Sequence, residues 1–183
     1  MTVRQLGAIF AAGLSVLVAG GVAAAQENSP FGGFKHDSSE PIEITSDSLE
    51  VRQSEQRAIF AGAVEAGQGT LRLNADRVIV AYDQQEQNNE TGAIRNMKAE
   101  GNVFLTNGAE TATGRFAEYD VITGMMFMRG EVILTQGTNV VSGELLEINL
   151  NTGRAQMKGG VTTTGTGGRV KSIFTPSANT GSN

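Results

Sequence analysis

Apolar and polar residues alternate along most of the chain beyond Pro41. The segments IEIT at 42–45 and LRLN at 71–74, for example, carry an apolar residue at every second position. Successive side chains of a β-strand point to opposite faces, so each such segment would have one apolar face and one polar face. No window of helical length carries a sustained apolar stripe with the helical period. The pattern therefore predicts a mature protein that is almost entirely β.

A motif of the form G-x-V recurs four times, each copy preceded two positions earlier by an apolar residue. The glycines are Gly62, Gly101, Gly130 and Gly159, with spacings of 39, 29 and 29 residues, and the longer first interval contains a polar insertion at 83–93. A second recurring segment begins at positions 47, 76, 114 and 143. A unit of this length cannot enclose a core alone, whereas stacked copies bury a continuous apolar strip. We therefore expect about four stacked β-repeats.

Strand parity indicates which side chains face that strip. Residues two before and two after each repeated glycine share a face. Glycine at this position would let the strand bend. In the second recurring segment the parity is less clear, because Phe116 and Tyr119 fall on opposite faces unless a bulge lies between them. The face set by the glycines comprises Phe60, Val64, Val103, Leu105, Met128, Val132, Leu134, Met157 and Val161.

The two ends of the chain read differently from its middle. Arg4, an apolar run from Leu6 to Ala19 and small residues up to Ala25 have the order of a cleaved secretory signal peptide, so we assign residues 1–25 to one. An uncleaved membrane anchor is the alternative, because the apolar or small stretch has about 20 residues. Residues 26–40 are interpreted as a flexible lead-in, whose Phe31 and Phe34 could dock on a partner, and residues 177–183 as a disordered tail.

Composition excludes several classes of function. The formal net charge is -5 and the isoelectric point is near 4.9, which argues against a nucleic-acid partner. There is no cysteine, so neither disulfides nor thiolate metal sites are available. With 24 glycines and no tryptophan, the chain has the composition of strands and turns.

Candidate catalytic groups are few. His36 is the only histidine, and it lies in the lead-in. The acid pairs Glu118/Asp120 and Glu144/Glu147 satisfy the minimum for a glycosidase, but in a chain with 19 acidic residues such pairs arise by chance. The glycine-rich stretch at 165–168 does not precede a helix, so no phosphate-binding loop is expected. We expect neither an enzyme nor a protein with a metal or cofactor. The Met125, Met126 and Met128 cluster fits an adaptable apolar surface or an ordinary core equally well.

Several motifs occur together in a fixed order. They are P-I-x-I at 41–44, the repeated x-F-x-G-x-V strand, N-A-D at 74–76 and the ending G-R-V-K-S-I-F-T-P at 168–176. This set resembles the OstA-like family over residues 41–176. The resemblance implies a twisted, incompletely closed β-jellyroll of stacked antiparallel strands, located in the periplasm, whose interior shelters the acyl chains of lipopolysaccharide (lipid A).

The resemblance also implies partners and lipid contacts. Such domains associate head to tail and bridge an LptC-like inner-membrane component and an LptD-like outer-membrane component. Ile42 and Ile44 match lipid-contacting positions, and Phe104 and Tyr119 lie in matching segments. With the alternation, the candidate lipid-binding set is Ile42, Ile44, Leu49, Val51, Phe60, Val64, Leu71, Leu73, Val78, Val80, Val103, Phe104, Leu105, Phe116, Tyr119, Met128, Val132 and Leu134.

Other interpretations stay open at this point. A structural or adhesive β-repeat protein would have the same alternation without a lipid, and an LptC-like component would keep its membrane anchor. An enzyme using Glu144 or Glu147 is a third hypothesis. Arg72, Arg77 and Arg115 are candidates for contacts with lipid phosphates only because they lie on expected strands.

Overall fold

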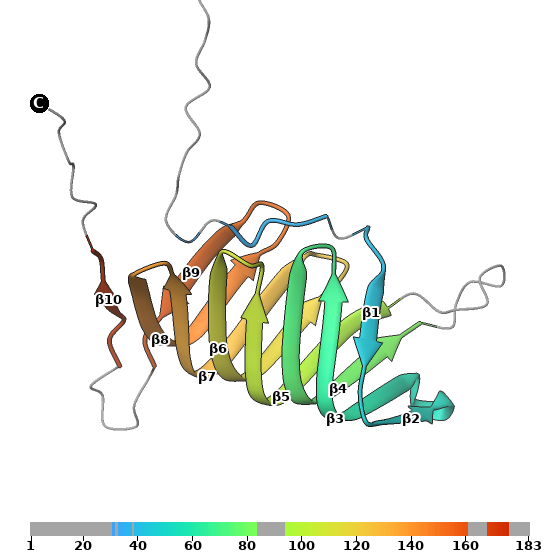
Figure 1. Ribbon diagram of the computed structural model, residues 1–183. Coiled ribbons are helices and arrows are strands. Elements are labelled where there is room, and N and C mark those ends of the chain that lie inside the picture. Colours follow the sequence, from blue (N-terminus) through green and yellow to red (C-terminus); the bar gives the residue numbers. More distant parts are fainter. Residues whose placement is uncertain (1–30, 32, 38, 84–93, 161–167, 176–183) are drawn as a thin grey trace, which may run out of the picture.

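The computed structural model describes residues 31, 33–37, 39–83, 94–160 and 168–175, and these residues form one twisted antiparallel sheet (Figure 1). Val161 and most of the insertion at 83–93 lie outside the described residues. In chain order the strands are β1 (Ile42–Thr45), β2 (Ser48–Arg52), β3 (Arg57–Gln68), β4 (Leu71–Tyr82), β5 (Ile94–Thr106), β6 (Glu110–Asp120), β7 (Met125–Gln136), β8 (Asn139–Asn149), β9 (Arg154–Lys158) and β10 (Lys171–Ile173).

Strands β3 to β8 follow one another in sequence and in space, each paired with the next. At one end, β1 and β2 both pair with β3; at the other, β9 and β10 both pair with β8. Within the described residues the sheet does not close on itself, and its one helical element is the short 3-10 turn Gln53–Glu55. None of the described residues forms a helix long and apolar enough to cross a membrane. The expected all-β, repeat-built, incompletely closed fold is confirmed.

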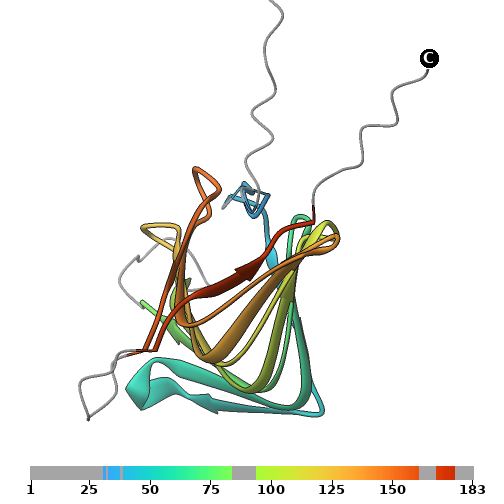
Figure 2. The same ribbon diagram turned by 90° about the vertical axis from the view of Figure 1, so that its left-hand side faces the viewer.

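Three of the four G-x-V motifs bend their strands. At Gly62, Gly101 and Gly130 the backbone has φ of 84°, 77° and 87°, and the following residue also has a positive φ. The pairing of β3 with β4, of β5 with β6 and of β7 with β8 shifts register at these positions, which is the signature of a bulge. Because the bends are in line, the whole sheet folds along one crease (Figure 2).

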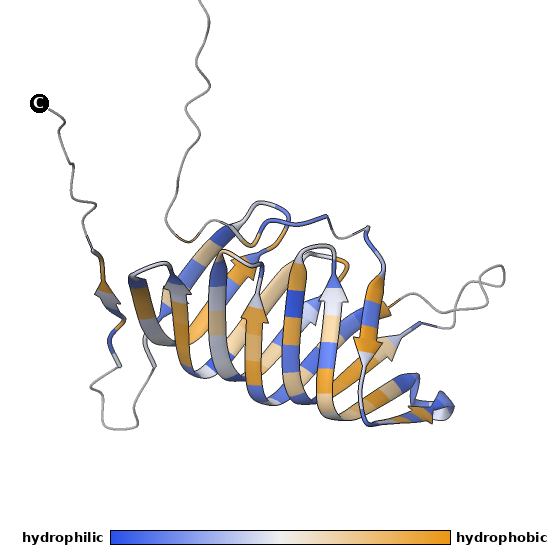
Figure 3. Ribbon diagram, viewed as in Figure 1, coloured by the Kyte–Doolittle hydropathy of each residue, from blue (hydrophilic) through white to orange (hydrophobic). Residues whose placement is uncertain are grey.

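The crease divides the sheet into two walls. The first wall contains β1, β10 and residues 64–75, 103–114 and 132–143; the second contains β2, β9 and residues 57–61, 77–82, 94–100, 116–120, 125–129 and 145–149. The alternation of apolar and polar residues appears as bands of colour along the long strands (Figure 3). Between the walls lies the core, which we call the trough.

The strands without a G-x-V motif change parity at the crease. In β6 the buried residues are Glu110 and Ala112 before the crease and Ala117 and Tyr119 after it, so an even series becomes an odd one. At the crease, each neighbouring strand with a bulge contains one residue more than β6. This difference in length changes which residues of β6 face inward. This resolves the ambiguity at Phe116 and Tyr119: the register breaks between Thr113 and Phe116, leaving Phe116 outside and Tyr119 inside.

Candidate functional site

Apolar side chains line the trough in rows that cross the sheet from strand to strand. Met128 and Leu146, for example, are paired across β7 and β8 and are fully buried. Of the candidate lipid-binding residues, those buried in the trough are Val64, Leu71, Val78, Val80, Val103, Leu105, Tyr119, Met128, Val132 and Leu134. Ile42, Ile44, Phe60 and Leu73 are half-buried and pack against the same cluster.

Two of the apolar rows in the second wall continue beyond the buried core, onto strand β2. Leu49 pairs with Phe60 and Val51 with Ala58, which places both β2 side chains in line with the apolar rows of the second wall. They are nevertheless 56% and 60% exposed. The apolar lining therefore runs out to the open edge at β2 and is not sealed there.

Phe104 and Phe116 are not brought into the trough. Phe104 alternates with the buried Val103 and Leu105, and Phe116 precedes the buried Ala117, so both rings lie on the outer face. Phe116 is 54% exposed. We therefore remove these two residues from the candidate set; the parity change at the crease is what misplaced Phe116.

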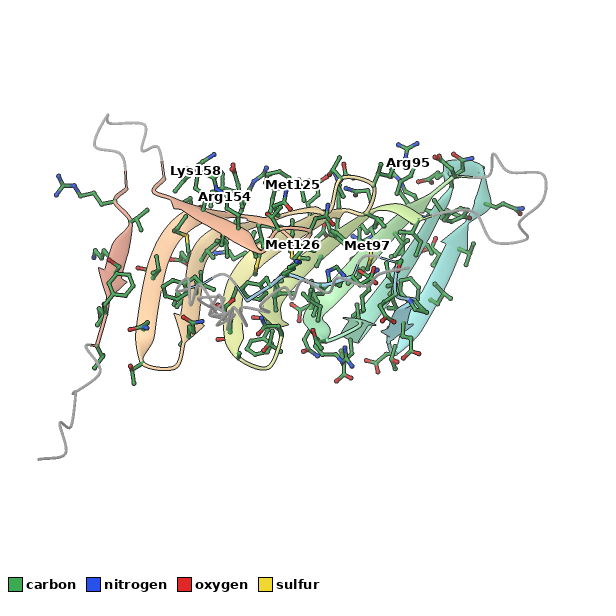
Figure 4. All side chains as sticks on the ribbon, turned by 90° about the horizontal axis from the view of Figure 1, so that it is seen from above. Arg95, Met97, Met125, Met126, Arg154 and Lys158 are labelled. Carbon is green, nitrogen blue, oxygen red and sulfur yellow. The ribbon has the colours of Figure 1, made fainter. Side chains whose placement is uncertain are left out.

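Sequence reasoning missed part of the lining. Met97 and Met126 face the trough from the second wall and lie toward the middle of the view from above (Figure 4). Met125 alternates with Met126 and faces outward. The pairing of β8 with Met126 and Met128 also places Ile148 and Leu146 inside, a relation that the register alone reveals.

Polar groups face inward near the rim of the first wall. Gln68 ends β3, Glu110 begins β6 and Gln136 ends β7, and Glu110 is fully buried. Burial raises the pKa of Glu110 above its ordinary value, and the backbone N–H of Gly33 opposes this shift. The Gln136 Nε2 donates to Glu110 Oε1 at 2.9 Å. The Tyr119 hydroxyl donates to Gln68 Oε1 at 3.3 Å, joining the two walls across the trough.

The described residues between 31 and 40, which we call the strap, pass over the open side of the trough (Figures 1 and 2). Phe34 is fully buried in the apolar cluster, and the His36 N–H donates to the Leu150 carbonyl at 3.0 Å. The expectation of a flexible lead-in did not include these contacts. The only local signal was the pair of phenylalanines, Phe31 and Phe34, in otherwise polar sequence.

An apolar pocket lies beneath the strap. Its lining comes from both walls, so only the folded sheet assembles it. The lining residues are His36, Ile42, Ala66, Gly67, Gln68, Leu71, Leu73, Val78, Met97, Ala99, Leu105, Ala117, Tyr119, Met126 and Leu150. The mainly apolar lining suits a hydrocarbon chain.

Basic residues lie outside the trough. Arg77 and Arg115 pair with Glu100 and Glu131, and the Arg72 Nη1 donates to the Gly69 and Leu71 carbonyls. Arg154 and Lys158 lie near one another on one margin of the second wall in the view from above, and Arg95 lies farther along the same margin (Figure 4).

The acid pairs proposed as an enzyme alternative also lie away from the pocket. Glu118 and Glu147 form ion pairs with Lys98 and Lys158, and neither acid lines the pocket. No group of three or more potential metal ligands occurs among the described residues.

Comparison with known families identifies the class of protein. The family model described as "LptA/(LptD N-terminal domain) LPS transport protein" matches residues 43–154, more than half of the chain. The chain belongs to this family, and its resemblance to OstA-like proteins is thereby confirmed.

Two known proteins show the extent of this similarity. An uncharacterised protein of Rhizobium meliloti (strain 1021) is 35% identical over 114 residues, and the match covers 61% of each chain. The crystal structure of LptH from Pseudomonas aeruginosa, described as the LptA-homologous periplasmic component of the lipopolysaccharide transport device, superposes with a TM-score of 0.63 at 18% identity. That match covers 76% of this chain and 99% of LptH. At this identity the likeness shows a shared fold.

Proposed function

We propose that this chain is a periplasmic lipopolysaccharide-binding transport protein that shelters the acyl chains of lipid A in the trough. The observation that carries the proposal is the continuity of the apolar rows, which run through the second wall and emerge at the exposed Leu49 and Val51. Covering apolar surface is worth about 25 cal/mol for each Å², so a trough of this kind stabilises an acyl chain in an aqueous compartment. Family membership supports the same cargo.

End-to-end association is the second part of the proposal. β1 and β2 at one end and β9 and β10 at the other each pair on one side only among the described residues, which leaves backbone groups for another strand. A copy of this chain, an LptC-like inner-membrane component or an LptD-like outer-membrane component would add to these edges, and the trough would continue from one domain into the next.

The ends of the chain complete this picture. Residues 1–25 act as a cleaved signal peptide for export, residues 41–176 form the lipid-binding domain, and residues 177–183 form a tail. The chain binds and passes on its cargo without changing it chemically, so no catalytic residue or cofactor is assigned.

Photocrosslinking tests the lipid site. A photoreactive residue in place of Ile42 or Ile44, which face the trough, should crosslink to lipopolysaccharide in envelope preparations. Glu43 lies between these two isoleucines and points outward, so the same photoreactive residue at position 43 is the matched control and should give little crosslinked lipopolysaccharide. Equal crosslinking from all three positions would contradict the proposal. A folded sheet with no lipid product at all would favour a structural or adhesive protein.

A further inference from the structure

The strap occupies the space that the proposed cargo would need. Phe34 is the strap's one fully buried side chain, and it belongs to the same apolar cluster as Leu71, Leu105 and Tyr119. His36 lines the apolar pocket beneath the strap, and its ring lies edge-on to that of Tyr119 with centroids 6.5 Å apart. An acyl chain entering from the open side would meet the rings of Phe34 and His36 first.

Hydrogen bonds to the strap come from the polar residues at the rim of the first wall. The Gly33 N–H donates to both carboxylate oxygens of Glu110, at 3.2 and 3.1 Å. The Phe31 N–H donates to Gln136 Oε1 at 3.3 Å. The His36 Nε2 lies 2.8 Å from Gln68 Oε1, and the Gln68 Nε2 donates to the Glu40 carbonyl at 2.9 Å. Polar side chains that face inward from an apolar wall thus find partners in the strap.

The attachment is nevertheless narrow. Besides Phe34, only Phe31 packs against the apolar cluster, and it is half-buried. Lys35 and Asp37 of the strap form no ion pair within the described part of the chain. The strap contributes no strand to the sheet. One buried ring, the half-buried Phe31, one backbone hydrogen bond to Leu150 and a few side-chain hydrogen bonds hold the strap, and its departure would leave both walls and their pairing intact.

We propose that the strap is a built-in occupant of the trough, seated through Phe34, which an entering acyl chain must displace. This inference rests on the proposed lipid-binding function and adds regulation to it. An apolar ring and a hydrocarbon chain compete for the same surface, so the apparent affinity for the acyl chain is the intrinsic affinity multiplied by the fraction of molecules in which the strap is unseated. The strap also keeps the trough covered between cargoes, which limits exposed apolar surface.

Two variants unseat the strap by different means. Phe34→Ala removes the buried ring. Gly33→Val keeps the ring but adds a side chain where a Cβ atom would lie 3.0 Å from both Asn107 Nδ2 and Glu110 Cδ, so these side chains must shift and the hydrogen bonds from the Gly33 N–H to Glu110 should weaken. Phe116→Ala is the matched control, because it removes a phenylalanine from the outer face without touching the strap.

The measurement is the affinity of the full chain for a fluorescent long-chain fatty acid and for purified lipopolysaccharide, with circular dichroism to verify the sheet. Phe34→Ala and Gly33→Val should each bind about tenfold more tightly than the parent, while Phe116→Ala should bind as the parent does. If the folded strap variants bind with unchanged or weaker affinity while the parent binds well, the strap is not a competitor and this inference is overturned, with the proposed function intact. If neither the parent nor any variant binds either probe, the proposed function falls, and the inference falls with it.

Discussion

The conformation of a few residues at the crease decides the shape of the trough. Gly62, Gly101 and Gly130 have positive φ, and the residues after them, Ala63, Asn102 and Glu131, do as well. A positive φ costs an ordinary L-residue about 1–2 kcal/mol, so two in succession persist only where the surrounding sheet compensates. Glycine at the first position removes half of that cost, which explains why the repeat carries glycine there.

A pair of glycine variants separates backbone strain from crowding. Gly101 has a φ of 77°, and an added Cβ would overlap the Asp76 carboxylate; Gly108 has a φ of 92°, with nothing within 4 Å of its position. Gly108→Ala should lower the free energy of unfolding by about 1 kcal/mol from strain alone. Gly101→Ala should cost about 1–3 kcal/mol more, because Asp76 must move. Urea denaturation measures both; equal losses would contradict a crowded crease.

At the scale of elements, the two ends of the sheet differ from its middle. β1, β2, β9 and β10 have 3 to 5 residues, whereas β3 to β8 have 11 to 13. Short, charged edge strands such as SLEVR in β2 limit indiscriminate pairing. Leu49 and Val51 remain exposed, and the end-to-end association proposed above would bury them against a partner whose own apolar rows continue theirs.

A charged residue in place of Leu49 or Val51 should prevent end-to-end association. Leu49→Asp or Val51→Asp should shift the protein toward monomer in sedimentation velocity at high concentration, because burying an unpaired carboxylate in an interface is costly. Since both side chains are mostly exposed within one molecule, the melting temperature should change little. Thr45→Asp, on the outward face of β1, is the control and should associate as the parent does. Unchanged association of the β2 variants would place the interface elsewhere.

On the scale of the whole molecule, backbone pairing in the described part of the chain joins each long strand only to the strands beside it, as in a stack of repeats. Such architectures have nearly additive stability, so a complete unit can be removed if the register survives. Gly101 and Gly130 occupy equivalent positions 29 residues apart. Removing residues 101–129 joins the second-wall part of β5 to the first-wall part of β7, which keeps the crease and both inner faces.

We expect this deletion to fold into a shorter sheet. Its far-UV circular dichroism should remain that of a β-protein, and its urea m-value should fall, since less surface is buried. Deletion of residues 101–128 is the control. It leaves Arg129 as one extra residue before Gly130, which turns the apolar side chains of the preceding strand to the outer face, so this variant should fail to fold. If both deletion variants fold, or if neither does, the exact 29-residue length of the repeat does not control folding.

The sequence by itself determined the repeat, the bends and much of the lining. Alternation is a local property of each strand, and the glycine that permits a bulge lies in the motif itself, so Phe60, Val64, Met128 and Val132 could be assigned to the inner face in advance. The OstA-like resemblance added the fold and a candidate cargo through its ordered motifs.

The tertiary structure alone decided the rest. The face of Phe116 depends on how many residues the neighbouring bulged strand inserts, which local alternation within β6 does not encode. The strap is held by partners 77 and 105 positions away, Glu110 and Gln136, that become neighbours only when the sheet has folded along its crease. No local pattern distinguishes Glu110 from the other acidic residues, because its burial results from the strap above it and the wall beside it.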